Sequence, residues 1–305
     1  LMHDVATVAL LTTSGIRPDS PGVSMLITVA AALVVVVVAP EPLRRILRTR
    51  PLPAEGLRAR LEQLSARAGT RHRDVLLWHT DYGMGNAAVM GVIPQVRYVL
   101  LSDLLLESMK DRQIEAVFAH ELGHVVHRHT LWFLLFLLVF VLLLGFCELA
   151  AAGVVSRLGV SDSTRWAVEV GGFALAVAVG VTLFGFFSRR LERQADVYAA
   201  RVIQQAVDGG SGDPRRYPVG VEGALALGSA LQRAAAINHI PPEARSFRHG
   251  SVLSRIGFIQ RLAGDPRLTR AFDRSMLALY AALFGSLIVG STAAAWLIAR
   301  GYASW

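Results

Sequence analysis

Four long apolar runs constrain the fold of this chain more than any other feature of its sequence. They cover residues 23–40, 131–155, 166–187 and 275–299, and each is close to the ~20 residues that a helix needs to cross a bilayer. Of the 305 residues, 53% are hydrophobic, which is more than a typical soluble enzyme carries. We therefore expect a mainly α-helical, multi-pass membrane protein.

The basic residues lie mostly beside these runs. The formal net charge is +8, and all but one of the 31 basic residues are Arg. Four of them fall within 44–50, directly after the first run, and positive residues at the end of a span indicate the cytosolic side. We expect residues 41–130 and 188–274 to form one cytosolic catalytic domain in two parts, and residues 1–22 and the short link 156–165 to be extracytoplasmic. No motif indicates nucleic-acid binding.

The sequence between the first two runs predicts a small α+β region. Leu57, Leu61 and Leu64 recur at helical spacing, and the stretches that follow are rich in strand-forming residues. We expect Asp103 and Asp111 to cap two helices. The predicted elements are a helix at 54–68, strands at 74–79, 86–91 and 97–102, and helices at 104–109 and 113–129.

The motif His120-Glu121-Leu122-Gly123-His124 lies in the last of these helices. Histidines four residues apart project from one helical face, so both imidazoles can reach one metal ion. Glu121 stands beside them, where it can accept a proton from a water molecule. Two His ligands with Glu as the general base are typical of zinc peptidases. Because the pattern also occurs by chance in unrelated helices, a third ligand is needed.

Glu192 is the predicted third ligand. The two spans between Leu131 and Phe187 return the chain to the side that it left. His124 lies roughly 10 Å before the second span, and Glu192 lies roughly 7 Å after the third. Asp196 is one helical turn beyond Glu192, where it can accept a hydrogen bond from a metal-bound histidine. The alternative is that both carboxylates are solvated partners of the neighbouring Arg residues.

These motifs resemble the integral-membrane zinc metallopeptidases that include the HtpX-type proteases and the CAAX prenyl proteases. The resemblance covers about residues 54–260 and also rests on Asn86-Ala-Ala-Val-Met-Gly91 and Leu100-Leu-Ser-Asp-Leu-Leu-Leu-Glu107. It implies a gluzincin-like α+β domain at the cytosolic membrane surface, with a small sheet and active-site helices. One Zn²⁺ per chain would be held by His120, His124 and Glu192, with Glu121 as the base.

The resemblance also implies how a substrate would bind. The segment at Asn86 would be an edge strand that pairs with an extended protein or peptide substrate. A late family segment resembles residues 247–256, where Gly250 replaces the usual Pro. His249 and Arg255 would then stabilise the oxyanion or hold substrate, or be structural.

The resulting hypothesis is a zinc metalloendopeptidase of the cell (inner) membrane, in protein quality control or processing. The alternative is a catalytically silent membrane scaffold that retains zinc. We expect His127 to be a hydrogen-bonding helix residue on the face of His120, whereas His129 does not share that face. Glu148 is expected near the far end of its span, reaching headgroups. The sequence favours no particular oligomeric state.

Overall fold

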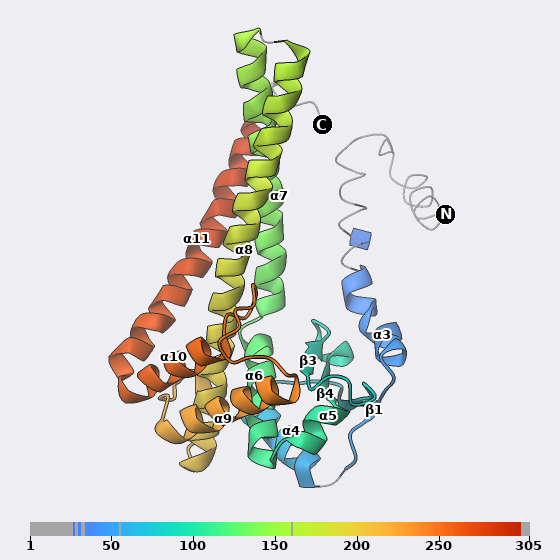
Figure 1. The fold of residues 1–305 in the computed structure, drawn as a ribbon, viewed down its shortest axis with the longest axis vertical. Coiled ribbons are helices and arrows are strands. Elements are labelled where there is room, and N and C mark those ends of the chain that lie inside the picture. Colours follow the sequence, from blue (N-terminus) through green and yellow to red (C-terminus); the bar gives the residue numbers. More distant parts are fainter. Residues whose placement is uncertain (1–26, 28–29, 32–33, 55, 160, 300–305) are drawn as a thin grey trace.

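The computed structural model describes residues 27, 30–31, 34–54, 56–159 and 161–299. Among them, three helices are long and apolar enough to cross a membrane: α7 (His129–Leu158), α8 (Asp162–Val207) and α11 (Pro266–Ala299). They rise side by side from a base of shorter helices and a small sheet (Figure 1). The apolar windows of these helices are largely uncovered, as expected for lipid-facing surfaces. Eight of the 18 residues of the first predicted span, 23–40, lie outside the described residues.

Helix α8 joins the predicted third span to the polar region after it. It has 46 residues without a break, which corresponds to about 69 Å, more than twice the hydrocarbon thickness of a bilayer. One rigid element therefore passes from the apolar stalk into the base. The predicted link 156–165 is mostly helical, because α7 ends at Leu158 and α8 begins at Asp162.

Within the described residues the base contains one four-stranded sheet in the order β1-β2-β4-β3. β2 (Asp74–Trp78) runs parallel to β4 (Tyr98–Ser102), and β3 (Ala87–Met90) pairs antiparallel with the other side of β4. The three predicted strands are confirmed. β1 (Thr49–Pro51) was not predicted, because three residues that include Arg and Pro carry no strand signal. β3 is an edge strand.

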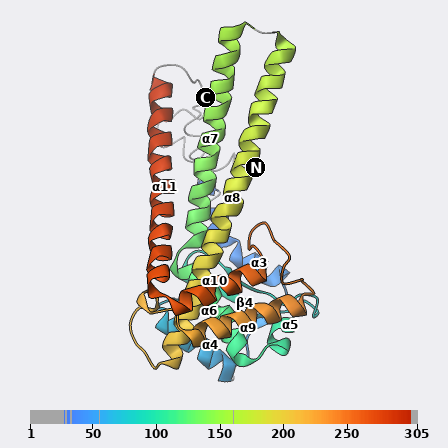
Figure 2. The ribbon, with the colours of Figure 1, turned by 60° about the vertical axis from the view of Figure 1, so that its left-hand side comes forward.

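Helices surround this sheet, and α6 lies at their centre (Figure 2). Gly123 of the motif allows α6 to touch α8, since a Cβ at this position would stand only 2.9 Å from Ala195 Cα. The close approach brings the motif beside the part of α8 that begins at Glu192. The base helices are α3 (Pro40–Ile46), α4 (Gly56–Arg67), α5 (Asp103–Ser108), α6 (Asp111–Val126), α9 (Val221–Ile237) and α10 (Val252–Gly264).

Both predicted helix caps were wrong. Ser102 caps α5 through its hydroxyl, which accepts from the Leu105 amide at 3.3 Å. The Asp103 carboxylate instead accepts from the backbone N–H groups of Thr80 and Tyr82. Burial opposes a charge on Asp103, but hydrogen bonds from the Thr80 hydroxyl and from the backbone N–H groups of Leu104, Thr80 and Tyr82 outweigh it and lower the pKa of Asp103. Lys110, not Asp111, occupies the N-cap of α6.

The motif helix does not run on into the second span as the sequence suggested. α6 ends at Val126, and Arg128 adopts a left-handed conformation with φ +54° before α7 begins at His129. A non-glycine residue seldom adopts this conformation. The break turns His129 back toward the motif.

Candidate active site

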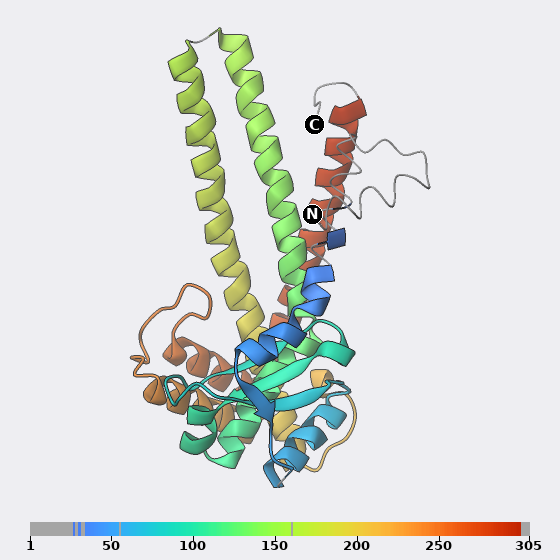
Figure 3. The same ribbon diagram turned by 90° about the vertical axis from the view of Figure 1, so that its right-hand side faces the viewer.

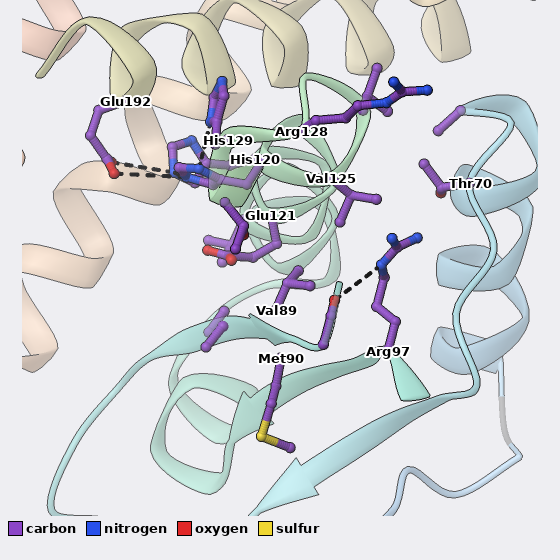
Figure 4. Close-up of a pocket in the computed structure, with 18 of the residues that line it drawn as sticks. Thr70, Val89, Met90, Arg97, His120, Glu121, Val125, Arg128, His129 and Glu192 are labelled. Atoms are coloured by element: carbon purple, nitrogen blue, oxygen red, sulfur yellow. Dashed lines mark hydrogen bonds and ion pairs between the residues drawn. The ribbon is translucent and has the colours of Figure 1, made fainter. Parts of the chain in front are cut away.

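The structure brings the three predicted ligands together. The Nε2 atoms of His120 and His124 lie 3.3 Å apart, and those atoms lie 3.6 Å and 3.8 Å from the nearest carboxylate oxygens of Glu192. Ligand atoms about 2.05 Å from a tetrahedral zinc ion would be about 3.4 Å apart. Figure 4 shows the Glu192 carboxylate facing His120. This donor set and its spacing therefore fit a zinc ion.

Asp196 and Arg255 support the first histidine. Asp196 Oδ1 lies 3.0 Å from His120 Nδ1, close enough for the carboxylate to stabilise a proton on this ring nitrogen. Arg255 donates to both oxygens of the buried Asp196, at 2.8 Å and 2.6 Å. Its nearest approach to Glu192 is 4.0 Å. Arg255 therefore holds Asp196 in place, which matches the structural alternative considered for it from the sequence.

His129 supports the second histidine, which the sequence reasoning missed. His129 Nδ1 lies 2.8 Å from His124 Nδ1, and His129 Nε2 lies 3.0 Å from Gln194 Oε1. The same Gln194 oxygen accepts from the Tyr280 hydroxyl. An amide oxygen only accepts, so neutral His129 carries its proton on Nε2. His124 must then donate from Nδ1, which leaves its Nε2 lone pair free for a metal.

The environments of the two ligand histidines differ. Burial opposes a charge on His120, but the carboxylates of Asp196 and Glu192 outweigh it and raise its pKa to about 10. Burial, together with the neighbouring His120 and His129, lowers the pKa of His124. A metal ion bound here must therefore displace a proton from His120, whereas His124 offers its lone pair directly.

Glu121 lies between the two histidines and the sheet (Figure 4). Burial raises its pKa to about 7, although the neighbouring His120 and the backbone of Val89 on β3 act in the opposite direction. A carboxyl group with a pKa near neutrality can both take up and release a proton at physiological pH. Its position and its pKa suit a general base.

A cleft of about 1300 Å³ leads to these residues and is lined by His120, Glu121, His124 and Glu192. β3 borders it, with one edge bonded to β4. Asn86 also lines the cleft, and its side chain accepts from the Ala87 amide at 3.0 Å. This is an ordinary turn contact at the start of the strand.

His249 reaches the site from the loop between α9 and α10. Its Nδ1 lies 2.9 Å from Glu192 Oε2, and 49% of its side chain is exposed. Two other candidates lie outside the ligand group. His127 packs edge-on against Tyr198, with ring centroids 5.6 Å apart. Glu148 lies on α7, about 28 Å along the helix from His129.

The site has two histidines and a carboxylate around one point, with a half-buried glutamate beside them. Together with the membrane-length helices above it, this arrangement defines the class of integral-membrane metallopeptidases. The chain belongs to peptidase family M48, whose family model matches residues 51–213.

Curated relatives agree with this assignment, and a solved structure shares the fold. The chain is 30% identical over 251 residues to a protein named protease HtpX homolog from Aeropyrum pernix, covering 79% of this chain and 72% of that one. It is 30% identical over 154 residues to a protein of the same name from Bacteroides fragilis, covering 50% of this chain and 44% of that one. The crystal structure of S. mikatae Ste24p matches with a TM-score of 0.55 at 17% identity, over 84% of this chain and 61% of that chain.

Proposed function

We propose that this chain is a zinc-dependent endopeptidase of the cell (inner) membrane that hydrolyses peptide bonds of protein substrates on the cytosolic side. The observation that carries the proposal is the convergence of His120, His124 and Glu192, within 4.8 Å of one another, at a cleft that also exposes Glu121. Membership of family M48 supports it. Quality control or processing of membrane proteins is the role that we propose for it.

His120, His124 and Glu192 would hold one Zn²⁺ per chain. The metal would supply Lewis acidity, which polarises the scissile carbonyl and makes water more acidic. Glu121 then accepts the proton of the attacking water and delivers it to the leaving amine. The substrate backbone lies extended along the free edge of β3, where main-chain hydrogen bonds hold it and Asn86 marks one end of the strand.

We propose that His249 assists the reaction from the loop between α9 and α10. Its exposed ring contacts Glu192 only through Nδ1, so a small movement of its loop would let it donate to the oxyanion of the tetrahedral intermediate. Arg255 acts indirectly, because it fixes the Asp196 carboxylate next to His120.

The test is hydrolysis of casein in detergent by the wild-type protein and by Glu121→Gln, with zinc measured in both. We expect zinc in both proteins and cleavage only by the wild type, since the amide cannot accept a proton. Full activity of Glu121→Gln would contradict the mechanism. Zinc in both proteins without cleavage of casein or of membrane-protein substrates would favour the scaffold alternative.

A further inference from the structure

The loop that carries His249 also reaches toward the membrane. It connects α9 to α10 and rises beside α8, on the side of the base from which the long helices leave (Figures 2 and 3). Its tip is a tight hairpin in which Ser246 and Gly250 exchange two backbone hydrogen bonds of 3.1 Å and 3.0 Å. The Ser246 hydroxyl accepts from the His249 amide at 2.9 Å. Residues 246–250, the hairpin tip, therefore behave as one unit.

One side of the hairpin tip lies against the last turn of the predicted third span. The Phe247 ring stacks on Phe184, with centroids 6.2 Å apart. Its backbone carbonyl accepts from Arg189 at 2.9 Å. Phe247 is 49% exposed, and Phe186, in the same turn of α8 as Phe184, is also exposed. An aromatic ring at the end of a span, next to arginines, is characteristic of the membrane–water interface.

Four arginines lie close in sequence to this ring or to the end of α8 that it packs against, and one of them, Arg189, contacts the Phe247 backbone. They are Arg189 and Arg190 on α8 and Arg245 and Arg248 on the loop. Within the part of the chain that the structure describes, none of the four forms an ion pair with a carboxylate, including that of the adjacent Glu243. Unneutralised arginines at this depth are complementary to phosphate headgroups, and each contributes about a factor of five to the affinity for an anionic surface.

The other side of the hairpin tip carries His249, which lies 2.9 Å from Glu192. Only Arg248 separates the lipid-facing Phe247 from this histidine. The position of His249 at the site is therefore tied to the position of the tip at the membrane surface.

We propose that the hairpin tip is a docking element for anionic phospholipids. Phe247 inserts among the acyl chains at the interface, and Arg189, Arg190, Arg245 and Arg248 bind the phosphate groups. This contact holds His249 over Glu192. The consequence for catalysis rests on the proposed function, whereas the contact with lipid does not.

The first experiment measures the depth of the tip. A spin label is attached to Phe247→Cys in a Cys147→Ala background, and the protein is placed in nanodiscs that contain phosphatidylglycerol. We expect the label to be accessible to oxygen and protected from a water-soluble nickel complex. The same label on Arg112→Cys, at the end of α6 that is remote from the stalk, is the control and should be fully exposed to the nickel complex. Equal exposure of the two labels would overturn the proposal.

The second experiment measures the response to lipid charge. Peptide hydrolysis and enrichment of phosphatidylglycerol around the protein are compared in nanodiscs of phosphatidylcholine with and without phosphatidylglycerol. We expect the anionic lipid to raise the wild-type rate and to be enriched around the protein. In Arg190→Gln/Arg245→Gln we expect both responses to shrink severalfold, and in Arg112→Gln we expect both to be retained. Equal responses in all three proteins would contradict the proposal.

The experiments can contradict the proposed function and the lipid-docking proposal independently of each other. If no variant hydrolyses peptide in any lipid, the proposed function fails, while label depth and lipid enrichment still decide whether the tip docks on anionic lipid. If hydrolysis occurs but neither depth nor enrichment depends on the tip, the docking proposal alone is wrong.

Discussion

At the scale of single residues, the site depends on side chains that fix the orientation of the ligands. Helical spacing predicted the pair His120 and His124, and it placed Asp196 on the face of Glu192. Glu192 itself was predicted because the two spans return the chain to the side of the motif. The sequence did not predict His129, because that residue is five positions after His124 and would leave the face of a continuous helix. Only the left-handed backbone at Arg128 returns its ring to the site.

We predict that His129→Phe lowers zinc affinity by about 10- to 100-fold, the usual effect of removing the partner of a metal-bound histidine. The phenylalanine fills the space but no longer accepts the proton of His124 Nδ1. Competition with a chromogenic chelator measures the affinity. His239→Gln, an exposed histidine outside the site, serves as the control and should bind zinc as the wild type does. Equal affinity in all three proteins would show that His129 does not orient His124.

The pKa of Glu121 predicts how the reaction depends on pH. Burial raises this pKa to about 7, and a neighbouring metal cation would lower it. The protonated carboxyl cannot accept a proton, so kcat/KM should fall with acidification below an apparent pKa of about 7 or less. The profile is measured with a peptide whose own charge does not change in this range. A kcat/KM that stays constant from about pH 8 to about pH 5 would exclude Glu121 as the base.

At the scale of elements, the packing of α6 on α8 joins the two halves of the site. Hydrophobic alternation and helical periodicity were enough to predict α4, α6 and the strands β2, β3 and β4. They did not predict β1 or the break after α6, because a short edge strand and a left-handed residue are stabilised by tertiary contacts. The predicted cap at Asp103 was wrong because its carboxylate accepts hydrogen bonds from the turn at Thr80.

We predict that Gly123→Ala destabilises the protein and weakens zinc binding. The added methyl group meets Ala195 Cα at 2.9 Å, so α6 must move away from α8, at a cost of about 1–3 kcal/mol. Gly153→Ala on α7 is the matched control, since nothing lies within 4 Å of its added Cβ. It should be neutral or slightly stabilising. The unfolding temperatures of the two variants are measured with and without zinc. A similar loss of thermal stability in both variants would argue against this helix contact.

At the scale of the whole molecule, three long helices stand on one base (Figure 3). Hydropathy alone predicted these helices, because a run of about 20 consecutive apolar residues seldom forms anything other than a membrane-spanning helix. It did not predict that α8 would continue unbroken for 46 residues. This continuity places Glu192 at a fixed height below the third span.

The proposed orientation predicts two opposite labelling patterns. A cysteine at Ser211, in the loop after α8, should react with a membrane-impermeant maleimide in inverted vesicles but not in intact cells. A cysteine at Ser163, in the first turn of α8, should show the reverse. Both are made in the Cys147→Ala background. The same pattern for both positions would contradict the hairpin of spans, and a reversed pattern would place the site outside the cytosol.

The most direct test of the central claim is the zinc content of the purified protein, with Glu192→Gln, Glu121→Gln and the wild type measured together. The account predicts one zinc ion per chain in the wild type and in Glu121→Gln, and a large loss in Glu192→Gln, whose amide is a poor ligand. Because Glu192→Gln keeps the shape of the side chain, the loss would report on ligation itself. Zinc retained at one per chain by Glu192→Gln would contradict the three-ligand site.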